Sequence, residues 1–181
     1  MMGDIMYLQQ VLKQPDAKDF VQAVIKEVNG HVDCKSWTLK KRSKVPEDFQ
    51  IVPSVWTMQR KQDLTLGRVT KHKARLNLHG GKQEFGTNYY KTYAPVVTWF
   101  AIQLLIVFGI LFNWALCQVN FVLAYPQAPI KMDMYMELAT GIHTKHGNSK
   151  DHVLKLLANI YRQKQAGCVW NSYLVTKLRE I

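Results

Sequence analysis

Apolar side chains recur at helical spacing in several stretches of the chain. In the first, Phe20, Val24 and Val28 follow at four-residue intervals between Asp16 and Gly30. This spacing places them on one face of a helix that begins near Asp16 and ends at Gly30. Similar patterns predict three more helices, over residues 98–114, 153–160 and 167–181.

Other stretches alternate apolar and polar positions, which is the period of a half-buried β-strand. A short strand and a basic turn are predicted over residues 36–44. Residues 51–78 predict a β-hairpin, in which Pro53 restricts the first strand to a sheet edge or a strand start. A second hairpin is predicted from residues 116–122 and 132–138.

The composition favours a folded chain. Apolar residues make up 48% of the 181 residues and charged residues only 20%, a balance that supports a core and excludes a disordered tail. Cys34, Cys117 and Cys168 are scattered, which fits free thiols in a reducing compartment better than a disulfide framework. No signal peptide is visible near the N-terminus. We therefore expect an intracellular protein of the cytoplasm or nucleus that is not secreted.

Most of the positive charge lies in one part of the sequence. The chain has 24 Lys and Arg residues against 13 Asp and Glu, a formal net charge of +11. Residues 35–91 alone contain 13 of the basic and 4 of the acidic residues, a local charge of +9. Such a stretch favours a polyanion as partner, because each cation set against a phosphate releases counterions. A solvated basic surface without a partner is the alternative.

The second strand of the first predicted hairpin carries the residues with the clearest chemistry. Side chains alternate between the two faces of a strand, so Lys71, Lys73 and Arg75 share one face while Ala74 and Leu76 lie on the other. Residues on one face follow at about 6.6 Å, so neighbouring cations can bind neighbouring phosphates of one ligand. This face predicts a phosphate-binding surface.

Residues 92–130 contain no Asp, Glu, Lys or Arg. Within them, residues 96–117 are long enough to cross a bilayer, for which about 20 apolar residues suffice. Gln103 and Asn113 interrupt this run, and a buried helix followed by a buried strand explains it better. We therefore expect a core helix over residues 98–114 and no membrane span.

Six blocks of sequence occur in the order and at the spacing of one known family. They are residues 71–76 (KHKARL), 89–97, 113–120, 134–137, 152–156 and 161–170. Together they resemble the reverse transcriptase of copia-type LTR retrotransposons. The resemblance implies an α+β fold with a fingers hairpin and the first half of a palm, incomplete at the C-terminus. It assigns residues 16–95 to the fingers and 96–181 to a partial palm, after a poorly ordered segment over residues 1–15.

The resemblance also implies functional residues. Lys73 and Arg75 would hold the triphosphate of an incoming deoxynucleotide, and Tyr125 would pack against its sugar and exclude a 2′-hydroxyl. Gln165 would contact the nucleotide or the template. The RNA template and DNA primer would contact basic residues of the hairpin, which are Arg60, Lys61 and Lys71. The family reaction is RNA-templated DNA synthesis with two Mg²⁺ ions.

The chain departs from this family at the metal ligands. Mg²⁺ prefers carboxylate oxygens, and the first of the family's aspartates is replaced by Asn120. The other two form an Asp-Asp pair, which these 181 residues do not contain. Arg162 stands where the family usually has glycine, a residue that permits close approach or a positive φ. We therefore expect a truncated, catalytically inactive copy that binds no Mg²⁺ productively.

Two other outcomes are open at the level of the sequence. One is a basic nucleic-acid-binding module without catalysis, which the cationic hairpin is sufficient to support. The other is a chain that does not reach a stable fold, because half a palm leaves strand edges unpaired and the uncharged span exposed.

Overall fold

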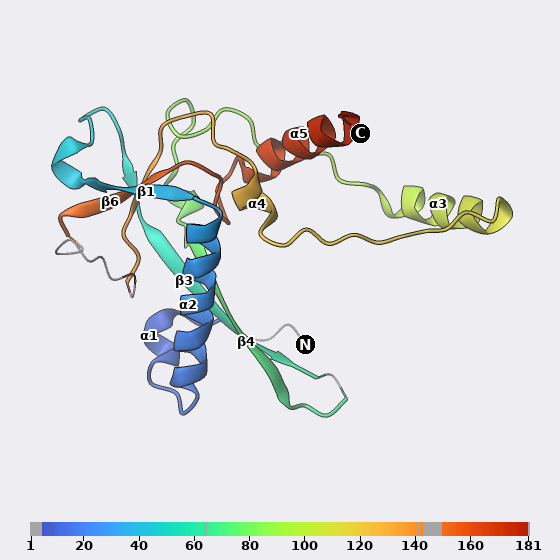
Figure 1. The fold of residues 1–181 in the computed structure, drawn as a ribbon, viewed down its shortest axis with the longest axis horizontal. Helices are drawn as coiled ribbons and strands as arrows, with labels where there is room; N and C mark the ends of the chain where they lie inside the picture. The colour runs from blue at the N-terminus through green and yellow to red at the C-terminus, as the bar shows by residue number, and fades with distance from the viewer. Residues whose placement is uncertain (1–4, 64, 141, 143–149, 181) are drawn as a thin grey trace.

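The computed structural model describes residues 5–63, 65–140, 142 and 150–180, and contains both helices and sheets, as an α+β fold requires. Four strands form one sheet in the order β1–β6–β5–β2, of which β1 and β6 are labelled in Figure 1. Antiparallel pairs join β1 (Trp37–Lys41) to β6 (His152–Leu156) and β6 to β5 (Tyr135–Glu137). β2 (Ile51–Val52) lies parallel to β5 at the edge.

A separate antiparallel hairpin consists of β3 (Ser54–Gln62) and β4 (Val69–Leu78), which confirms the hairpin predicted from residues 51–78. Pro53 divides the first predicted strand, so that β2 joins the larger sheet and β3 joins the hairpin. Ala74 and Leu76 of β4 are buried, as the alternation predicts. This buried face packs against α2 (Ala17–Asp33), which lies beside the hairpin in Figure 1.

The N-terminal helix agrees with its prediction, except that α2 continues beyond Gly30 to Asp33. Phe20 and Val24 on its apolar face are buried against the hairpin. The sequence pattern placed the end of the helix at glycine. In the structure, the buried side chain of His31 holds the next turn in place, with its Nδ1 3.1 Å from the hydroxyl of Ser36.

Residues 5–15 differ from the poorly ordered segment that the sequence predicts over residues 1–15. The N–H of Met6 donates to the carbonyl of Met58 at 2.9 Å, and the N–H of Met58 donates back at 2.8 Å. α1 (Leu8–Val11) then buries Val11 completely. The segment is thus held along β3 by backbone bonds and one core side chain. Residues 1–4 lie outside the described part of the chain.

One hydrophobic core joins α2, the hairpin and the four-stranded sheet. Its largest fully buried apolar side chains are Phe20, Met58, Leu76, Leu78, Met134, Met136, Leu154, Leu156 and Ile160. Because these side chains come from both sheets, the core fixes the hairpin relative to the strands that follow it. The exposed face of the hairpin is therefore held in a defined position beside the loop after β6.

Two of the predicted elements are wrong. Residues 116–122 do not form a strand, since they have no regular secondary structure and their side chains are exposed. β5 therefore pairs with β2 and β6 instead of forming a second hairpin. Residues 153–160 were predicted to form a helix, but they contain most of strand β6. A short apolar run buried on both faces of a sheet has no period that separates it from a buried helix.

A helix forms within residues 98–114 as predicted, but it is not buried. α3 (Trp99–Leu111) is capped by Thr98, whose hydroxyl accepts a backbone N–H at 3.3 Å. Its apolar side chains are exposed, Ile110 to 76%. Figure 1 shows α3 far from the core, at the end of two extended connections. No helix in the described part of the chain is both long and apolar enough to cross a membrane.

The last predicted helix is confirmed as α5 (Ala166–Arg179), and the short helix α4 (Ala124–Gln127) lies beside it. Single turns of 3₁₀-helix follow β1 and β4, namely η1 (Arg42–Lys44) and η2 (Gly80–Lys82). The loop before α5 is tied to the segment after β4 through Lys164, whose Nζ donates to the Tyr89 hydroxyl at 3.1 Å. This connection holds the loop near the end of the hairpin.

Candidate functional site

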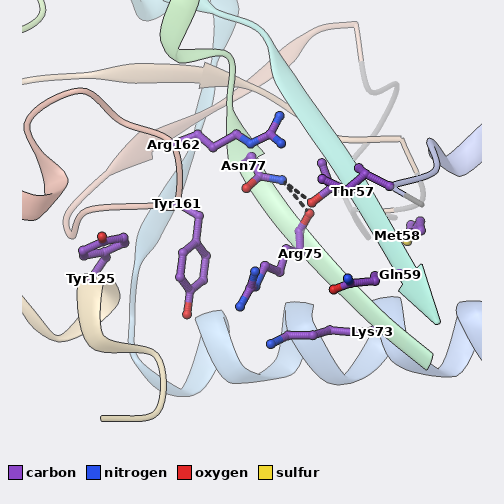
Figure 2. A pocket seen from close by; sticks show the side chains of 10 residues that line it. Thr57, Met58, Gln59, Lys73, Arg75, Asn77, Tyr125, Tyr161 and Arg162 are labelled. Atoms are coloured by element: carbon purple, nitrogen blue, oxygen red, sulfur yellow. Dashed lines mark hydrogen bonds between the residues drawn. The ribbon is translucent and has the colours of Figure 1, made fainter. Parts of the chain in front are cut away.

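A cavity of about 250 Å³ lies between the hairpin and the loop that leads from β6 to α5 (Figure 2). The N-terminal segment, both strands of the hairpin, α4 and the loop all contribute to its wall. The lining residues are Ile5, Thr57, Met58, Gln59, Lys73, Arg75, Asn77, Tyr125, Tyr161 and Arg162.

β4 contributes Lys73, Arg75 and Asn77 to the cavity, because every second residue of a strand shares a face. The Nδ2 group of the buried Asn77 donates to Thr57 Oγ1 at 2.9 Å and to the carbonyls of Val55 and Arg75 at 3.2 and 3.0 Å. Figure 2 shows two of these bonds beside the cations. They tie β3 to β4 and thereby fix the face that carries Lys73 and Arg75.

Two tyrosines form an aromatic wall. The rings of Tyr125 and Tyr161 lie edge to face, with centres 5.5 Å apart. The guanidinium carbon of Arg75 lies 5.4 Å from the centre of the Tyr161 ring, within the range of a cation–π interaction. The carbonyl of Tyr161 accepts the N–H of Leu78 at 3.0 Å, which anchors the loop to β4. Burial raises the pKa of the Tyr161 hydroxyl, so this group is uncharged at neutral pH.

Arg162 adopts a left-handed backbone conformation, with φ at 65°. This conformation costs a residue with a side chain about 1–2 kcal/mol, and glycine would adopt it without that cost. The loop also passes so close to η2 that a Cβ on Gly80 would overlap the carbonyl oxygen of Arg162. Gly80 is therefore needed for the loop to approach the hairpin.

The cavity has a positive charge. Among the described residues that line it, Lys73, Arg75 and Arg162 are cations, and none is Asp or Glu. Burial lowers the pKa of the Lys73 ammonium, repulsion from Arg75 and Lys61 lowers it further, and attraction to Glu27 opposes this. Cations that repel one another in a partly buried site are stabilised when an anion enters. The arrangement therefore suits a ligand with phosphate groups and a ring for the tyrosines.

Three of the four residues predicted to bind a nucleotide come together here. Lys73, Arg75 and Tyr125 line the same cavity, although they come from separate segments. Gln165 does not join them. It lines a different cavity of about 490 Å³ beside α5, and its Oε1 accepts a bond of 3.0 Å from Gln83 Nε2. Its contact with a nucleotide stays a prediction.

The three cations predicted to contact nucleic acid differ in their surroundings. Nε and Nη2 of Arg60 donate to the two carboxylate oxygens of Asp16 at 2.7 and 2.8 Å. These bonds hold the pKa of Asp16 well below its usual range and join the hairpin to the start of α2. Arg60 thus forms an internal ion pair. Lys61 and Lys71 are exposed and lie opposite each other across the hairpin.

A pair of Mg²⁺ ions requires carboxylate oxygens, and none of the described residues that line the cavity is Asp or Glu. Asn120 is exposed, lies on the irregular segment before α4 and is not part of the cavity wall. The sequence predicted it on a strand, which does not form. Within the described part of the chain, no three His, Cys, Asp or Glu side chains come together in a group that could hold a metal ion.

Seven further residues of the cavity are absent from the predicted binding set, namely Ile5, Thr57, Met58, Gln59, Asn77, Tyr161 and Arg162. Asn77 could have been found from the alternation of β4, and the register of the hairpin places Thr57 opposite Arg75 and Gln59 opposite Lys73. Tyr161 and Arg162 also line the cavity. No local pattern links these two to the hairpin, because the tertiary contact between the loop and β4 brings them there.

Cations on a strand, set against a wall of tyrosines, form a site whose chemistry suits a ligand with phosphate groups. The profile of the family described as reverse transcriptase (RNA-dependent DNA polymerase) matches residues 34–181. The chain therefore belongs to this reverse transcriptase family, and the resemblance found in the sequence is confirmed.

The curated relatives are Pol polyproteins of copia-type transposons. The chain is 28% identical over 159 residues to the retrovirus-related Pol polyprotein from transposon RE2 of Arabidopsis thaliana, which covers 86% of this chain and 11% of the relative. The chain is 23% identical over 163 residues to the retrovirus-related Pol polyprotein from transposon TNT 1-94 of Nicotiana tabacum. This match covers 90% of this chain and 12% of the relative. The chain thus spans about a tenth of the length of these relatives. No solved structure matches it.

Proposed function

We propose that this chain is the nucleotide-binding part of a copia-type reverse transcriptase, with fingers over residues 16–95 and part of the palm over residues 96–181. Lys73 and Arg75 bind the triphosphate of a deoxynucleotide, and Tyr125 packs against its sugar. The observation that carries this proposal is that these three side chains, chosen from the sequence alone, line one cavity.

We also propose that the chain does not polymerise DNA by itself. Transfer of a nucleotidyl group in this family requires two metal ions held by carboxylates. Among the described residues, the cavity wall contains cations, tyrosines, neutral polar groups and apolar side chains but no carboxylate, and the amide of Asn120 has no negative charge to offset a dication. Binding of a nucleotide and its incorporation into DNA are therefore separate properties here.

Equilibrium binding of fluorescently labelled dATP tests the first proposal. We expect Lys73→Ala and Arg75→Ala each to weaken binding about tenfold, because each removes a charge-assisted hydrogen bond to phosphate. Arg68→Ala is the matched control, since Arg68 is an exposed cation of the same hairpin outside the cavity. Equal affinities for all three variants would contradict the assignment of the cavity.

A second candidate function is binding of a nucleic-acid strand without catalysis. The opposed Lys61 and Lys71 favour it, because both are exposed and neither forms an ion pair within the described residues. Binding of an RNA–DNA primer-template should weaken steeply between about 50 and 200 mM salt. The double variant Lys61→Ala with Lys71→Ala should reduce the salt slope by about two. An unchanged slope would exclude these lysines as phosphate contacts.

A further inference from the structure

The described wall of the cavity lacks the carboxylates that a site for a nucleotide–magnesium complex uses to hold the metal. Carboxylates in such a site bind the metal, and the metal in turn neutralises part of the triphosphate. Here the described lining contains Lys73, Arg75 and Arg162, with no carboxylate to hold a dication. From the described protein wall, a Mg²⁺ ion carried by a triphosphate would meet three cations and only neutral oxygen ligands.

The three cations follow the direction of β4. Lys73 and Arg75 are successive residues on one face, about 6.6 Å apart along the strand. The next residue on that face is Asn77, which forms a backbone bridge with Tyr161 and so brings Arg162 to the end of the row. Figure 2 shows Arg162 beside Asn77, with Arg75 and Lys73 further along the strand. A row of this kind fits a chain of phosphates better than a single anion.

The acidic group whose charge attracts the ammonium of Lys73 is Glu27 of α2. Its charge raises the pKa of Lys73, but its Oε1 accepts the N–H of Leu76 at 3.3 Å and lies 3.6 Å from Nε2 of His31. Glu27 is thus engaged on the buried side of β4 and is not part of the cavity wall. The row is left uncompensated on the face that a ligand would approach.

We propose that this cavity binds the triphosphate of a nucleotide in its metal-free form, and that Arg162 supplies the third phosphate contact. This inference rests on the proposed nucleotide-binding function and adds the state of the ligand. Free triphosphate has more negative charge than its Mg²⁺ complex, so a site made of cations alone prefers the free form. Arg162 adds its charge from a backbone position with φ at 65°, which a residue with a side chain adopts only at a cost in free energy.

The test is binding of dATP to the full chain in EDTA and in excess Mg²⁺, with ionic strength matched by NaCl. We expect binding in EDTA and a severalfold weaker affinity in Mg²⁺. Inorganic triphosphate should compete with dATP in EDTA, because the phosphates form the shared contacts. Failure of inorganic triphosphate to compete would contradict the proposal that the row of cations binds the phosphates of dATP.

Arg162→Gly separates the role of the charge from that of the fold. The variant should bind dATP about three- to fivefold more weakly in EDTA, as for an exposed charge contact, and its unfolding temperature should not fall, because glycine relieves the positive φ. Arg68→Gln, which removes an exposed cation outside the cavity, should leave affinity unchanged.

The possible failures are distinguishable. Binding that requires Mg²⁺, or that is unchanged in Arg162→Gly, would overturn the metal-free site and leave the proposed nucleotide-binding function in place. No binding of dATP under either condition would overturn both.

Discussion

The guanidinium carbon of Arg75 lies 5.4 Å from the centre of the Tyr161 ring. This contact joins the hairpin to the loop before α5, and it holds one of the cations that we propose to bind phosphate toward the cavity. Both partners line the site, so the ring restricts the positions that the long Arg75 side chain can occupy. A cation held in place before the ligand arrives loses less conformational entropy when it binds.

The ring of Tyr161 should therefore contribute to nucleotide affinity. We expect Tyr161→Ala to weaken dATP binding about two- to fivefold, the equivalent of a cation–π interaction of about 0.5–1 kcal/mol at an exposed site. Tyr161→Phe retains the ring and should bind within about twofold of the wild type. Fluorescence anisotropy with labelled dATP measures both. A loss in the Phe variant as large as in the Ala variant would contradict a role for the ring.

The ion pair between Asp16 and Arg60 should make stability depend on pH. The bonds from Arg60 hold the pKa of Asp16 below its value in the unfolded chain. The ionised carboxylate therefore stabilises the folded state above about pH 4, and this stabilisation is lost as the pH falls through the folded-state pKa. Asp16→Asn should lower the free energy of unfolding at neutral pH. The difference in this free energy between wild type and variant should shrink below about pH 4.

Urea unfolding at a series of pH values measures this gap. Asp19→Asn is the control, because Asp19 lies on the same helix with its side chain 63% exposed and 4.0 Å from His72. Asp19→Asn should change the free energy of unfolding only slightly at every pH. A gap for Asp16→Asn that does not vary with pH would show that the ion pair does not stabilise the fold.

The exposure of α3 predicts that its side chains tolerate charge. Ile110 is 76% exposed, so Ile110→Lys should change the free energy of unfolding by no more than about 0.5 kcal/mol. It should also reduce binding of a hydrophobic dye, since it interrupts an apolar surface. Leu154→Lys, at a core position that is 1% exposed, should not fold. Equal destabilisation by both variants in thermal unfolding would mean that α3 is buried.

Restoring one carboxylate should not restore catalysis. Asn120→Asp should give no primer extension on an RNA template with Mg²⁺ or Mn²⁺, because Asn120 lies outside the cavity wall and no carboxylate lines that wall among the described residues. Incorporation of deoxynucleotide above a no-protein control, in the wild type or in this variant, would contradict the proposed inactivity.

The sequence predicts those parts of the fold whose pattern is local. The spacing of Phe20 and Val24 predicts α2, and the alternation around Lys73 and Arg75 predicts the face of β4. Both signals arise because one side of each element faces the core and the other faces water. The place of Tyr125 in the site was implied by the family resemblance and by no local pattern.

The parts that could not be predicted depend on which partner an apolar segment finds. Residues 98–114 are apolar on every side, which usually means burial, but in this structure α3 lies on extended connections without covering neighbours. Residues 153–160 contain most of β6, which is buried on both faces of the sheet. A strand buried in this way does not alternate apolar and polar residues, so the pattern that identifies a strand is missing. The contact of Tyr161 with β4 is likewise tertiary.

An NMR titration of dATP into the isotopically labelled chain tests the central claim most directly, since it locates the nucleotide on the protein. We expect chemical-shift changes at Lys73, Arg75, Tyr125 and Tyr161, around the cavity between the hairpin and the loop. Changes confined to the α5 cavity, at residues such as Cys168 and Tyr173, or no changes at all, would contradict it.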